Sequence, residues 1–597
     1  MQLSTGMNAR LTVLLFLAAC APTPLEPSQV ADRPAYPSGG AAAPSGPAPG
    51  SEGAPETPSA GTPSSSPSSP DATTIPGPPP GAPQLLFSDL DSGPQTGWRG
   101  GTAHGAAVTL YGRNFGAARG DGHVVVCGRS LTEAADYLSW GAAAAVPTLQ
   151  TITFLVPADC ASGPTTMQVS VGGTATAALP FLVRPGEIHH VAAGAELQSA
   201  IDALSPGAIA YLEDGVAAAA PADFDACVNL PRDGAENRPI ALVGLPGATV
   251  TIGNPAMPRA LHNWVGARGG YARHWTIAQI RFTTDEQAIA PQTGWRVVGN
   301  RFTAPQAHGG MSGVVEGIGD HLRIYGNELY ALGRADVPKL YHALYITGVR
   351  RSGGSRAATE TDRDIGWNYF HDNNTNRAIN IYSEESASAF IENHRIHDNL
   401  IVDQRGDGIL LGAFVTGPSS VYNNVIVRAG LGPEWDEPSS HAGIRLYPGH
   451  PERSDTVVNV FHNTLVDNGY AGAAWEESGN VFLQDTSRAV IAIRNNVFVS
   501  HGEPHVAGES QALAASAARN LFEGGAAPAW DTAAVAGGVM FVAPQSLDFR
   551  LAPGSPARDV GDAAVAATVP SDFAGVRRPL GAGADLGAYE ATDSSKR

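Results

Sequence analysis

One asparagine recurs eight times between residues 300 and 520, each time in the same short phrase. An apolar residue stands three positions before it and another two positions after it, as Ile365 and Phe370 do around Asn368; only the last phrase has a small residue, Ala517, in the first position. Successive asparagines are 24 to 41 residues apart. A shortest period in the mid-twenties that insertions lengthen is typical of a solenoid whose coils stack on one axis. The eight residues are Asn300, Asn327, Asn368, Asn399, Asn424, Asn463, Asn496 and Asn520.

The phrases around these asparagines alternate β-branched or aromatic residues with others and lack helical spacing, so each coil is expected to consist of short strands. The chain is therefore predicted to form an all-β protein with a parallel β-helix. Strands of stacked coils lie ~4.8 Å apart, so one amide per coil can bond the next coil and satisfy buried turn backbone. Asparagine also tolerates the left-handed conformation that a turn requires. The asparagines thus predict the fold and carry no chemistry.

The net charge of the chain limits the classes of molecule that it can bind. The 597-residue chain has a formal net charge of -19 and no basic stripe, which argues against nucleic acid. The same charge disfavours a polyanionic ligand unless a local arginine cluster or a bound cation reverses the sign. Lysine occurs only at Lys339 and Lys596.

The N-terminus is predicted to carry an export signal. Residues 11–19 form an apolar run after Arg10 that is too short to span a bilayer. The run ends in Leu-Ala-Ala-Cys20, which resembles a bacterial lipobox, in which the cysteine is lipidated after cleavage. An ordinary signal peptide with a coincidental cysteine is the alternative. Residues 1–20 are therefore predicted to export the protein, with Cys20 anchoring it in a membrane at the bacterial cell envelope, at the outer membrane or the cell surface.

Residues 21–82 are rich in Pro, Ser, Gly and Ala and bury too little apolar surface to fold, so we expect a disordered tether. Residues 83–184 show alternating strands and Gly-rich turns. The phrase Leu110-Tyr-Gly-Arg-Asn-Phe-Gly116 in this region resembles an IPT/TIG domain, which implies an immunoglobulin-like sandwich acting as a spacer or binding module. Cys127 and Cys160 lie near the ends of predicted strands there, and export permits a disulfide between them. Cys227 is expected to be a buried thiol.

The β-helix is predicted over residues 185–525. Residues 194–204 have helical spacing, with Leu197, Ile201 and Leu204 on one face, and are expected to form a helix that caps the first coil. With the strands 208–212 and 240–244, this stretch resembles the opening of right-handed parallel β-helix proteins of the pectate-lyase-like superfamily. Residues 526–597 resemble the closing segment of secreted β-helix proteins and are expected to cover the last coil.

A candidate binding face follows from aligning the strand that precedes each asparagine phrase. Apolar pairs such as Leu344/Ile346 and Ile379/Ile381 are expected to point inward, so the residue between them should point outward. Exposed aromatic and planar polar side chains are what a sugar chain needs. A sheet must also place some side chains outward, and Tyr and Arg suit strands, so a purely structural role is the alternative. The expected outward column is Tyr345, Asn380, Leu410, Arg445 and Phe482; beyond it lie Thr347, Tyr382, Gly412, Tyr447 and Gln484, and before it His342, Arg377 and Asp407.

Two long intervals between successive asparagines are expected to form wall segments along the sides of this face. The interval after Asn327 contains Arg334, Asp336, Lys339, Tyr341, Arg350, Arg351 and Arg356. The interval after Asn424 contains Glu434, Trp435, Asp436, Glu437 and His441. The second group suggests a sugar site or a calcium site, because oxygen ligands from a loop suffice for calcium; a solvated loop is the alternative.

Two reactions fit such a face. Eliminative cleavage of an acidic polysaccharide needs a cation beside the uronate carboxylate and a base for its C5 proton. Arg377 and Arg445 are candidates for the first role. The candidates for the second are His342, Tyr345 and Lys339. Hydrolysis instead needs two carboxylates, for which Glu384, Glu385 and Asp407 are the nearest supply.

The most plausible function is thus a surface-anchored polysaccharide lyase, with a non-catalytic glycan-binding or adhesion protein and a glycoside hydrolase as alternatives. Asn380, Tyr382, Asp407, Tyr447 and Trp435 are the predicted substrate-binding residues. A polysaccharide and a membrane are the expected partners, and a monomer is expected. No cofactor is certain, although calcium fits the chemistry. His371 and His397, each followed by an Asp, are interpreted as turn residues rather than metal ligands.

Overall fold

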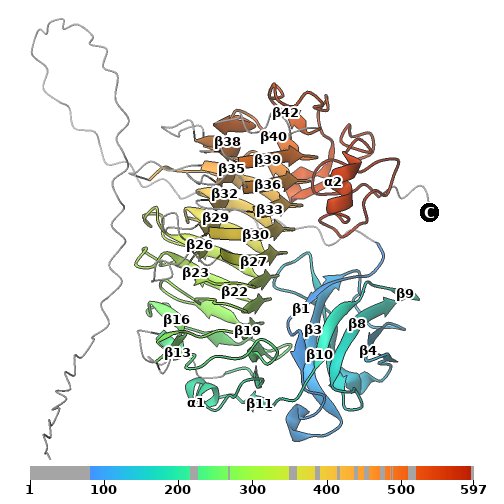
Figure 1. Cartoon of the computed structure of the whole chain (residues 1–597), viewed down its shortest axis with the longest axis vertical. Helices are drawn as coiled ribbons and strands as arrows, with labels where there is room; N and C mark the ends of the chain where they lie inside the picture. The colour runs from blue at the N-terminus through green and yellow to red at the C-terminus, as the bar shows by residue number, and fades with distance from the viewer. Residues whose placement is uncertain are drawn as a thin grey trace, which may run out of the picture. The chain divides into compact units, whose positions relative to one another are not determined.

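In the computed structural model, coils of short parallel strands form a β-helix that begins at β11 (Ile188–Val191). Three parallel sheets run along it, and Figure 1 shows their strands stacked in chain order, with the colour passing from green to red. The structure describes residues 81–215, 226–266, 269–348, 359–382, 390–412, 417–435, 441–448, 456–470, 477–484, 486, 489–508 and 519–592. Cys20 and the predicted tether therefore lie outside the described residues, except for the last positions of the tether.

An eleven-stranded sheet forms the first side of the β-helix. Every neighbouring pair of its strands is parallel, as stacked coils require. Its strands are β11, β12 (Ile209–Leu212), β14 (Ile240–Gly244), β19 (Trp275–Ala278), β21 (Arg296–Val298), β24 (Arg323–Tyr325), β27 (Thr359–Gly366), β30 (Phe390–His397), β33 (Gly417–Tyr422), β36 (Thr456–Phe461) and β39 (Ala489–Arg494).

A ten-stranded and a seven-stranded sheet form the other two sides. The ten strands are β15 (Thr251–Ile252), β20 (Arg281–Thr283), β22 (Arg301–Ala304), β25 (Glu328–Leu332), β28 (Tyr369–Asn373), β31 (Leu400–Gln404), β34 (Val425–Ala429), β37 (Thr464–Val466), β40 (Val497–Val499) and β42 (Leu521–Glu523). The seven are β23 (Gly313–Ile318), β26 (His342–Thr347), β29 (Arg377–Tyr382), β32 (Asp407–Gly412), β35 (His441–Tyr447), β38 (Ser478–Leu483) and β41 (Val506–Gly508). Two small sheets, β13 (Ala226–Asn229) with β16 (Arg259–His262) and β17 (Trp264–Val265) with β18 (Gly270–Tyr271), belong to the first coils.

The asparagines form the predicted ladder between the eleven-stranded and ten-stranded sheets. The side-chain amide of Asn368, for example, donates to Asn399 Oδ1 at 3.0 Å and to the Ile324 carbonyl at 2.9 Å. Its own Oδ1 accepts the main-chain N–H of Asn327 at 3.0 Å. The pattern repeats from Asn300 to Asn520, where the Asp531 carboxylate takes the place of the next amide at 2.7 Å.

The left-handed turn residue is not the ladder asparagine itself. The residue just before it has the positive φ, for example Trp367 at 57° and Asp398 at 51°. The expectation that the ladder asparagine supplies the left-handed conformation is therefore wrong. The amide ladder holds the neighbouring backbone in place, and the preceding residue makes the bend.

Both ends of the β-helix are covered. The helix α1 (Leu197–Asp202) is shorter than the predicted 194–204, and it buries Leu197 and Ile201 in the core of the first coils. At the other end, the Trp530 ring packs against Phe522, and the Val535 N–H donates to the Asn520 carbonyl at 2.8 Å. The rest of the closing segment contains β43 (Phe541–Ala543), the short 3-10 helix η5 (Pro544–Ser546), β44 (Asp548–Leu551) and α2 (Ala563–Thr568).

The closing segment also runs along the side of the coils. The Ala588 N–H donates to Thr464 Oγ1 at 2.9 Å, Arg578 donates to Asn423 Oδ1 at 3.0 Å, and the Asp562 N–H donates to Asn495 Oδ1 at 2.8 Å. Because these three partners belong to successive coils, the segment covers more of the β-helix than its last coil.

The N-terminal region is a β-sandwich of two sheets. One sheet contains β1 (Gln84–Ser88), β3 (His104–Arg113), β7 (Gln150–Pro157) and β6 (Tyr137–Ala143). The other contains β2 (Ser92–Gly93), β10 (Leu179–Val183), β8 (Gly163–Val171), β4 (His123–Val126), β5 (Arg129–Ser130) and β9 (Thr174–Ala175). Two 3-10 turns, η1 (Trp98–Gly100) and η2 (Ala134–Asp136), lie between strands. The expected Cys127–Cys160 disulfide is present, with the Cα atoms 5.6 Å apart, and Cys227 is a buried thiol.

Candidate functional site

The seven-stranded sheet has the register expected from its inward apolar pairs. Leu344 is opposite Ile379, which is opposite Ile409, and this row continues through Ile444 to Val481. All five side chains are fully buried in the β-helix core. The period-two alternation of the sequence therefore identified which residues share a row on this sheet.

The predicted outward column is in register but is not exposed. Tyr345, Asn380, Leu410, Arg445 and Phe482 face one another across neighbouring strands, yet each is at most 7% exposed. None of them is in the β-helix core. The expectation of an open column is thus wrong, because alternation fixes the direction of a side chain from the core but not what packs around it.

The arginines of this face are paired with acidic and amide groups. The Asp407 carboxylate, which is fully buried, lies 3.1 Å from Arg377 Nε and 4.0 Å from Arg445 Nη1, and it accepts the Ala442 N–H at 2.9 Å. Arg445 also donates to Gln484 Oε1 at 3.1 Å, and its guanidinium lies 5.4 Å from the Phe482 ring centre. Both arginines therefore have internal counter-groups in this structure.

His342 is a neutral base on this face. It is 3% exposed, and its ring centre lies 5.2 Å from that of Tyr345. Burial, and after it the positive charge of Arg377, lowers the pKa of His342 well below its ordinary value. Its Nδ1 makes no hydrogen bond within the described part of the chain. The imidazole is thus uncharged at neutral pH and has a nitrogen that can accept a proton.

Two tyrosines at the ends of strands remain partly exposed. Tyr382 on β29 and Tyr447 on β35 are one coil to either side of Gly412 on β32. Their ring centres are 6.5 Å apart and the rings are inclined by 23°. A Cβ at Gly412 would lie 3.2 Å from Tyr447 Cβ and 3.4 Å from Tyr382 Cδ2, so the missing side chain gives these rings their room. The pair gives the described part of this face a partly exposed aromatic surface.

The two wall segments contact each other. Trp435 Nε1 donates to the Val337 carbonyl at 2.8 Å, and the Arg405 guanidinium lies 3.9 Å from the Trp435 ring centre. One face of the indole is therefore occupied by Arg405, which weakens the expectation that Trp435 stacks on a sugar. Lys339 is partly exposed in the segment before β26. Arg350, Arg351, Arg356, Glu384, Glu385, Asp436 and Glu437 lie outside the described residues, and the expected calcium and hydrolase groups lie largely with them.

A second polar network on the eleven-stranded sheet was missed by sequence reasoning. His397 is the last residue of β30, and His371 lies within β28, so their interpretation as turn residues is wrong. His397 Nε2 is 2.7 Å from Asp364 Oδ1, and Nδ1 is 2.7 Å from Asp398 Oδ2. Burial opposes charging of this imidazole, but the two carboxylates outweigh it and raise the pKa of His397 to about 9. The sequence did contain a signal for this network, because these residues are spaced by one coil, which places Asp364 beside Arg395 and His397.

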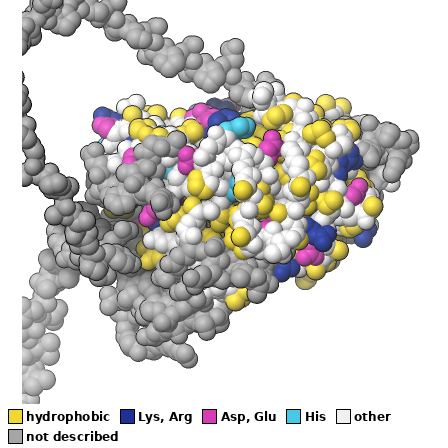
Figure 2. Space-filling view, turned by 90° about the horizontal axis from the view of Figure 1, so that it is seen from above, with side chains coloured by type: hydrophobic (Ala, Val, Ile, Leu, Met, Phe, Trp, Pro, Cys, Tyr) yellow, Lys and Arg dark blue, Asp and Glu magenta, His cyan; other side chains and the backbone are white. Residues whose placement is uncertain are grey.

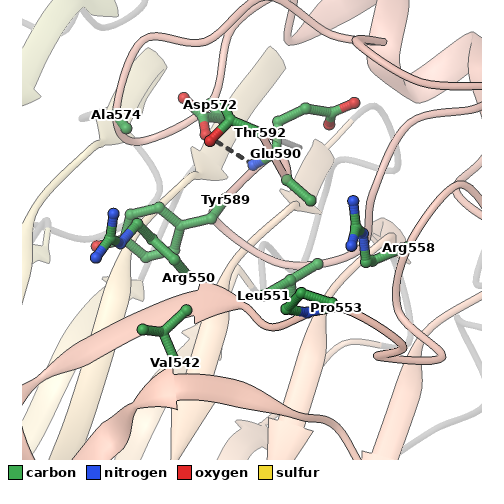
Figure 3. Close-up of a pocket in the computed structure, with 11 residues that line it drawn as sticks. Val542, Arg550, Leu551, Pro553, Arg558, Asp572, Ala574, Tyr589, Glu590 and Thr592 are labelled. Atoms are coloured by element: carbon green, nitrogen blue, oxygen red, sulfur yellow. Dashed lines mark hydrogen bonds between the residues drawn. The ribbon is translucent and has the colours of Figure 1, made fainter. Parts of the chain in front are cut away.

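The closing segment forms a partly open pocket of about 220 Å³ (Figure 3). Arg550, Arg558, Asp572 and Tyr589 are among its lining residues. Asp572 accepts the Glu590 N–H at 2.7 Å and the Val576 N–H at 2.5 Å, and burial raises its pKa to about 7. Arg550 is paired with Asp548 at 2.5 Å. Asp572 and Arg550 are thus held by partners within the closing segment itself.

One group of potential metal ligands converges among the described residues. Oxygen atoms of Asp285 and Glu286 and a ring nitrogen of His308 all lie within 4.8 Å of one another. The group lies between the ten-stranded and seven-stranded sheets, one coil before the candidate face. No sequence motif marked it.

The face of the molecule in Figure 2 carries mixed charge. Figure 2 shows acidic, basic and histidine side chains interspersed with apolar and uncharged ones on the face that it presents. Within the described residues, no helix combines the length and the apolar character that crossing a membrane requires.

Comparison with known proteins supports the fold. A family model described as "Right handed beta helix region" matches residues 347–498. No curated protein and no solved structure matches the chain. The matched stretch contains β27 to β39 and with them most of the candidate face, so these coils form a right-handed parallel β-helix.

Proposed function

We propose that this protein binds a polysaccharide along the outer side of the seven-stranded sheet. The observation that carries the proposal is the pair of partly exposed tyrosines, Tyr382 and Tyr447, that flank Gly412. Sugar rings present C–H faces that pack on aromatic rings, while their hydroxyls need planar hydrogen-bonding groups nearby. Arg377 supplies such a group on the same strand as Tyr382, with its side chain 13% exposed.

Binding is better supported than hydrolysis. Asp407 has no exposed surface and is already bonded to Arg377 and to the Ala442 main chain. A glycosidase carboxylate must reach the glycosidic bond or its water. Asp407 therefore fits a role in holding Arg377 in place, and Asn380, which is also buried, fits a structural role.

Elimination is the second candidate, and it is favoured by His342. A lyase base must be unprotonated at the working pH, and the lowered pKa of His342 meets that condition. Arg377 and Arg445 would have to exchange a present partner for the uronate carboxylate, since each has an internal counter-group. The elimination proposal therefore requires that substrate binding rearrange the buried charges and uncover His342, which is only 3% exposed.

The binding proposal is tested with Tyr382→Ala and Tyr447→Ala in affinity electrophoresis against a panel of neutral and acidic polysaccharides. Each substitution is expected to weaken retention about two- to tenfold, since aromatic stacking contributes about 0.5–1.5 kcal/mol. Tyr330→Ala is the matched control, because Tyr330 is a partly buried tyrosine that stacks on His371 on the ten-stranded sheet. Equal binding by all three variants and the wild type would reject the proposed face.

Elimination is tested on the same panel by the ultraviolet absorbance of unsaturated products. Wild-type protein is expected to produce them from a uronate polymer, and His342→Gln should abolish the product while retention on the polymer persists. Retention without product from any polymer would leave a binding protein and exclude the lyase.

We also propose that Cys20 carries a lipid anchor, so that the binding face is displayed at the cell envelope and the sandwich acts as its base. The lipobox-like phrase Leu-Ala-Ala-Cys20 supports this proposal. Metabolic labelling with a fatty-acid analogue should mark the wild type and not Cys20→Ala. Labelling of both proteins would contradict the anchor.

A further inference from the structure

The site formed by Asp285, Glu286 and His308 is rigidly built. Glu286 is 2% exposed, and its two carboxylate oxygens accept the main-chain N–H groups of His308 and Gly309 at 3.0 and 3.1 Å. The Asp285 N–H donates to the Met257 carbonyl at 2.9 Å. The backbone thus fixes the Glu286 carboxylate and the main chain of Asp285 before any ligand arrives.

The imidazole completes a three-donor group. His308 Nδ1 lies 2.5 Å from Glu286 Oε1 and 3.7 Å from Asp285 Oδ2. Among the described residues, His308 is the single basic side chain that pairs with either carboxylate. Two carboxylates therefore share one imidazole, which leaves at least one negative charge without a counter-charge.

The surroundings leave space for an ion. At Gly310, the nearest atom to an added Cβ would be Glu286 Oε1 at 3.6 Å. The absent side chain thus leaves the outer side of the carboxylate open. His308, with its side chain 61% exposed, provides the approach from solvent.

From this geometry we infer that Asp285, Glu286 and His308 bind a divalent first-row transition-metal ion, with zinc or manganese as the fitting chemical class. Carboxylate oxygen with imidazole nitrogen is a donor set that these ions accept, whereas calcium prefers oxygen ligands alone. Three protein ligands leave coordination positions for water or for an oxygen of a ligand. The inference does not depend on the proposed glycan binding.

Two hydrogen bonds made by side chains connect the site to the candidate face. The Tyr341 hydroxyl donates to the Glu286 carbonyl at 2.6 Å, and Tyr341 precedes His342 at the start of β26. Gln287, next to Glu286, donates to Glu316 at 2.9 Å, and Glu316 is opposite Tyr345. A bound ion would therefore fix the coil on which the first strands of the face stack.

The test uses the untagged full-length chain, stripped with a chelator, equilibrated with zinc and passed through a desalting column. We expect about one retained zinc per chain by elemental analysis, as for a single three-ligand site. Asp285→Asn and His308→Ala should lose this zinc, and the zinc-dependent rise in melting temperature should vanish with it. Asp285→Asn keeps the side-chain size, and the Glu286 contacts to the backbone are untouched, so folding is expected to persist.

His501→Ala is the matched control. His501 is an exposed histidine with Nδ1 2.6 Å from one carboxylate, Asp467, and it lacks the second carboxylate. It should retain the wild-type zinc content. Absence of zinc in the wild type, equal zinc in wild type and Asp285→Asn, or stabilisation by calcium but not by zinc or manganese would overturn the inference.

Discussion

At the scale of single residues, His397 shows how a buried position can hold a charge. Its two ring nitrogens each meet a carboxylate at 2.7 Å, the Trp367 ring meets it edge-on, and the Tyr422 ring stacks on it with centres 4.9 Å apart. Arg395 adds a second cation 2.8 Å from Asp364. Desolvation is costly here, and it is offset because every ionised group has at least one partner of opposite sign.

This arrangement predicts a pH-dependent stability. The folded-state pKa of His397, about 9, exceeds the ordinary value of 6.5. The contribution of the charged imidazole to folding stability is therefore complete below pH 6.5 and is lost as pH rises through 9. Burial opposes ionisation of Asp364, but His397 and Arg395 outweigh it and lower the pKa of this carboxyl. The contribution of the Asp364 carboxylate to folding stability is therefore present above pH 4 and is lost on acidification. The unfolding free energy of the wild type should fall between pH 6.5 and pH 10. This fall should exceed the fall for the His397→Gln variant by on the order of 2–3 kcal/mol.

Denaturant titrations at pH 6.5, 8 and 10 measure this difference. His501→Gln serves as the control. The carboxylate of Asp467 also raises the pKa of His501, but this histidine is exposed and solvent screens the pair, so its profile should stay nearly parallel to that of the wild type. If the His397→Gln profile is also parallel, the imidazole is not charged in the folded protein.

At the scale of elements, the asparagine ladder joins successive coils. Asn399 is fully buried and makes four hydrogen bonds through its side chain, which involve Asn368, Asn424 and the Ile365 carbonyl. Removing such a side chain leaves buried main-chain donors and acceptors unpaired, and each unpaired group costs about 1–3 kcal/mol. The ladder is therefore expected to contribute to stability at every coil.

Asn399→Ala is predicted to lower the unfolding free energy by about 2–4 kcal/mol. Asn399→Asp should be at least as harmful, because a carboxylate would face the Ile365 carbonyl and the Asn424 Oδ1 that now accept the amide protons. Asn459→Ala is the control, since Asn459 is partly exposed and makes a single 3.4 Å bond to Ser420. Urea titration compares the three variants; an Asn399→Ala protein as stable as Asn459→Ala would show that the ladder is not stabilising.

The elements also show what could be predicted from the sequence and what could not. The Asn399 phrase and the Ile379 and Ile409 pairs predicted the β-helix and its register, because a dry core requires apolar residues at fixed spacing. The exposure of Arg445 could not be predicted, because it depends on Phe482, Gln484 and Glu477, whose contacts arise from stacking. The group of Asp285, Glu286 and His308 was also missed because its contacts arise from stacking. Its two parts lie about one coil apart in sequence and meet only when the coils stack.

At the scale of the whole molecule, the sandwich packs directly against the β-helix. The Tyr211 hydroxyl donates to the Ala107 carbonyl at 2.9 Å, and Gln279 Nε2 donates to Asp89 Oδ2 at 3.0 Å. The Phe87 ring contacts both Tyr325 and Trp367, with ring centres 5.4 and 5.0 Å apart. One continuous apolar cluster includes sandwich residues and the outer face of the coils. The sandwich and the outer face of the β-helix therefore share one hydrophobic core.

The shared cluster predicts that the two regions unfold together. The Cys127–Cys160 disulfide closes a loop of 33 residues within the sandwich, and its loss should cost about 2–4 kcal/mol through the greater freedom of the unfolded chain. If the regions are coupled, the double variant Cys127→Ala/Cys160→Ala should show one calorimetric transition at a lower temperature, and tryptophans of both regions should report the same midpoint. An independent stalk would instead give an early sandwich transition while the β-helix transition stayed at its wild-type temperature. Cys227→Ala, which removes a buried thiol in β13 without opening a disulfide, is the control for the loss of a cysteine side chain.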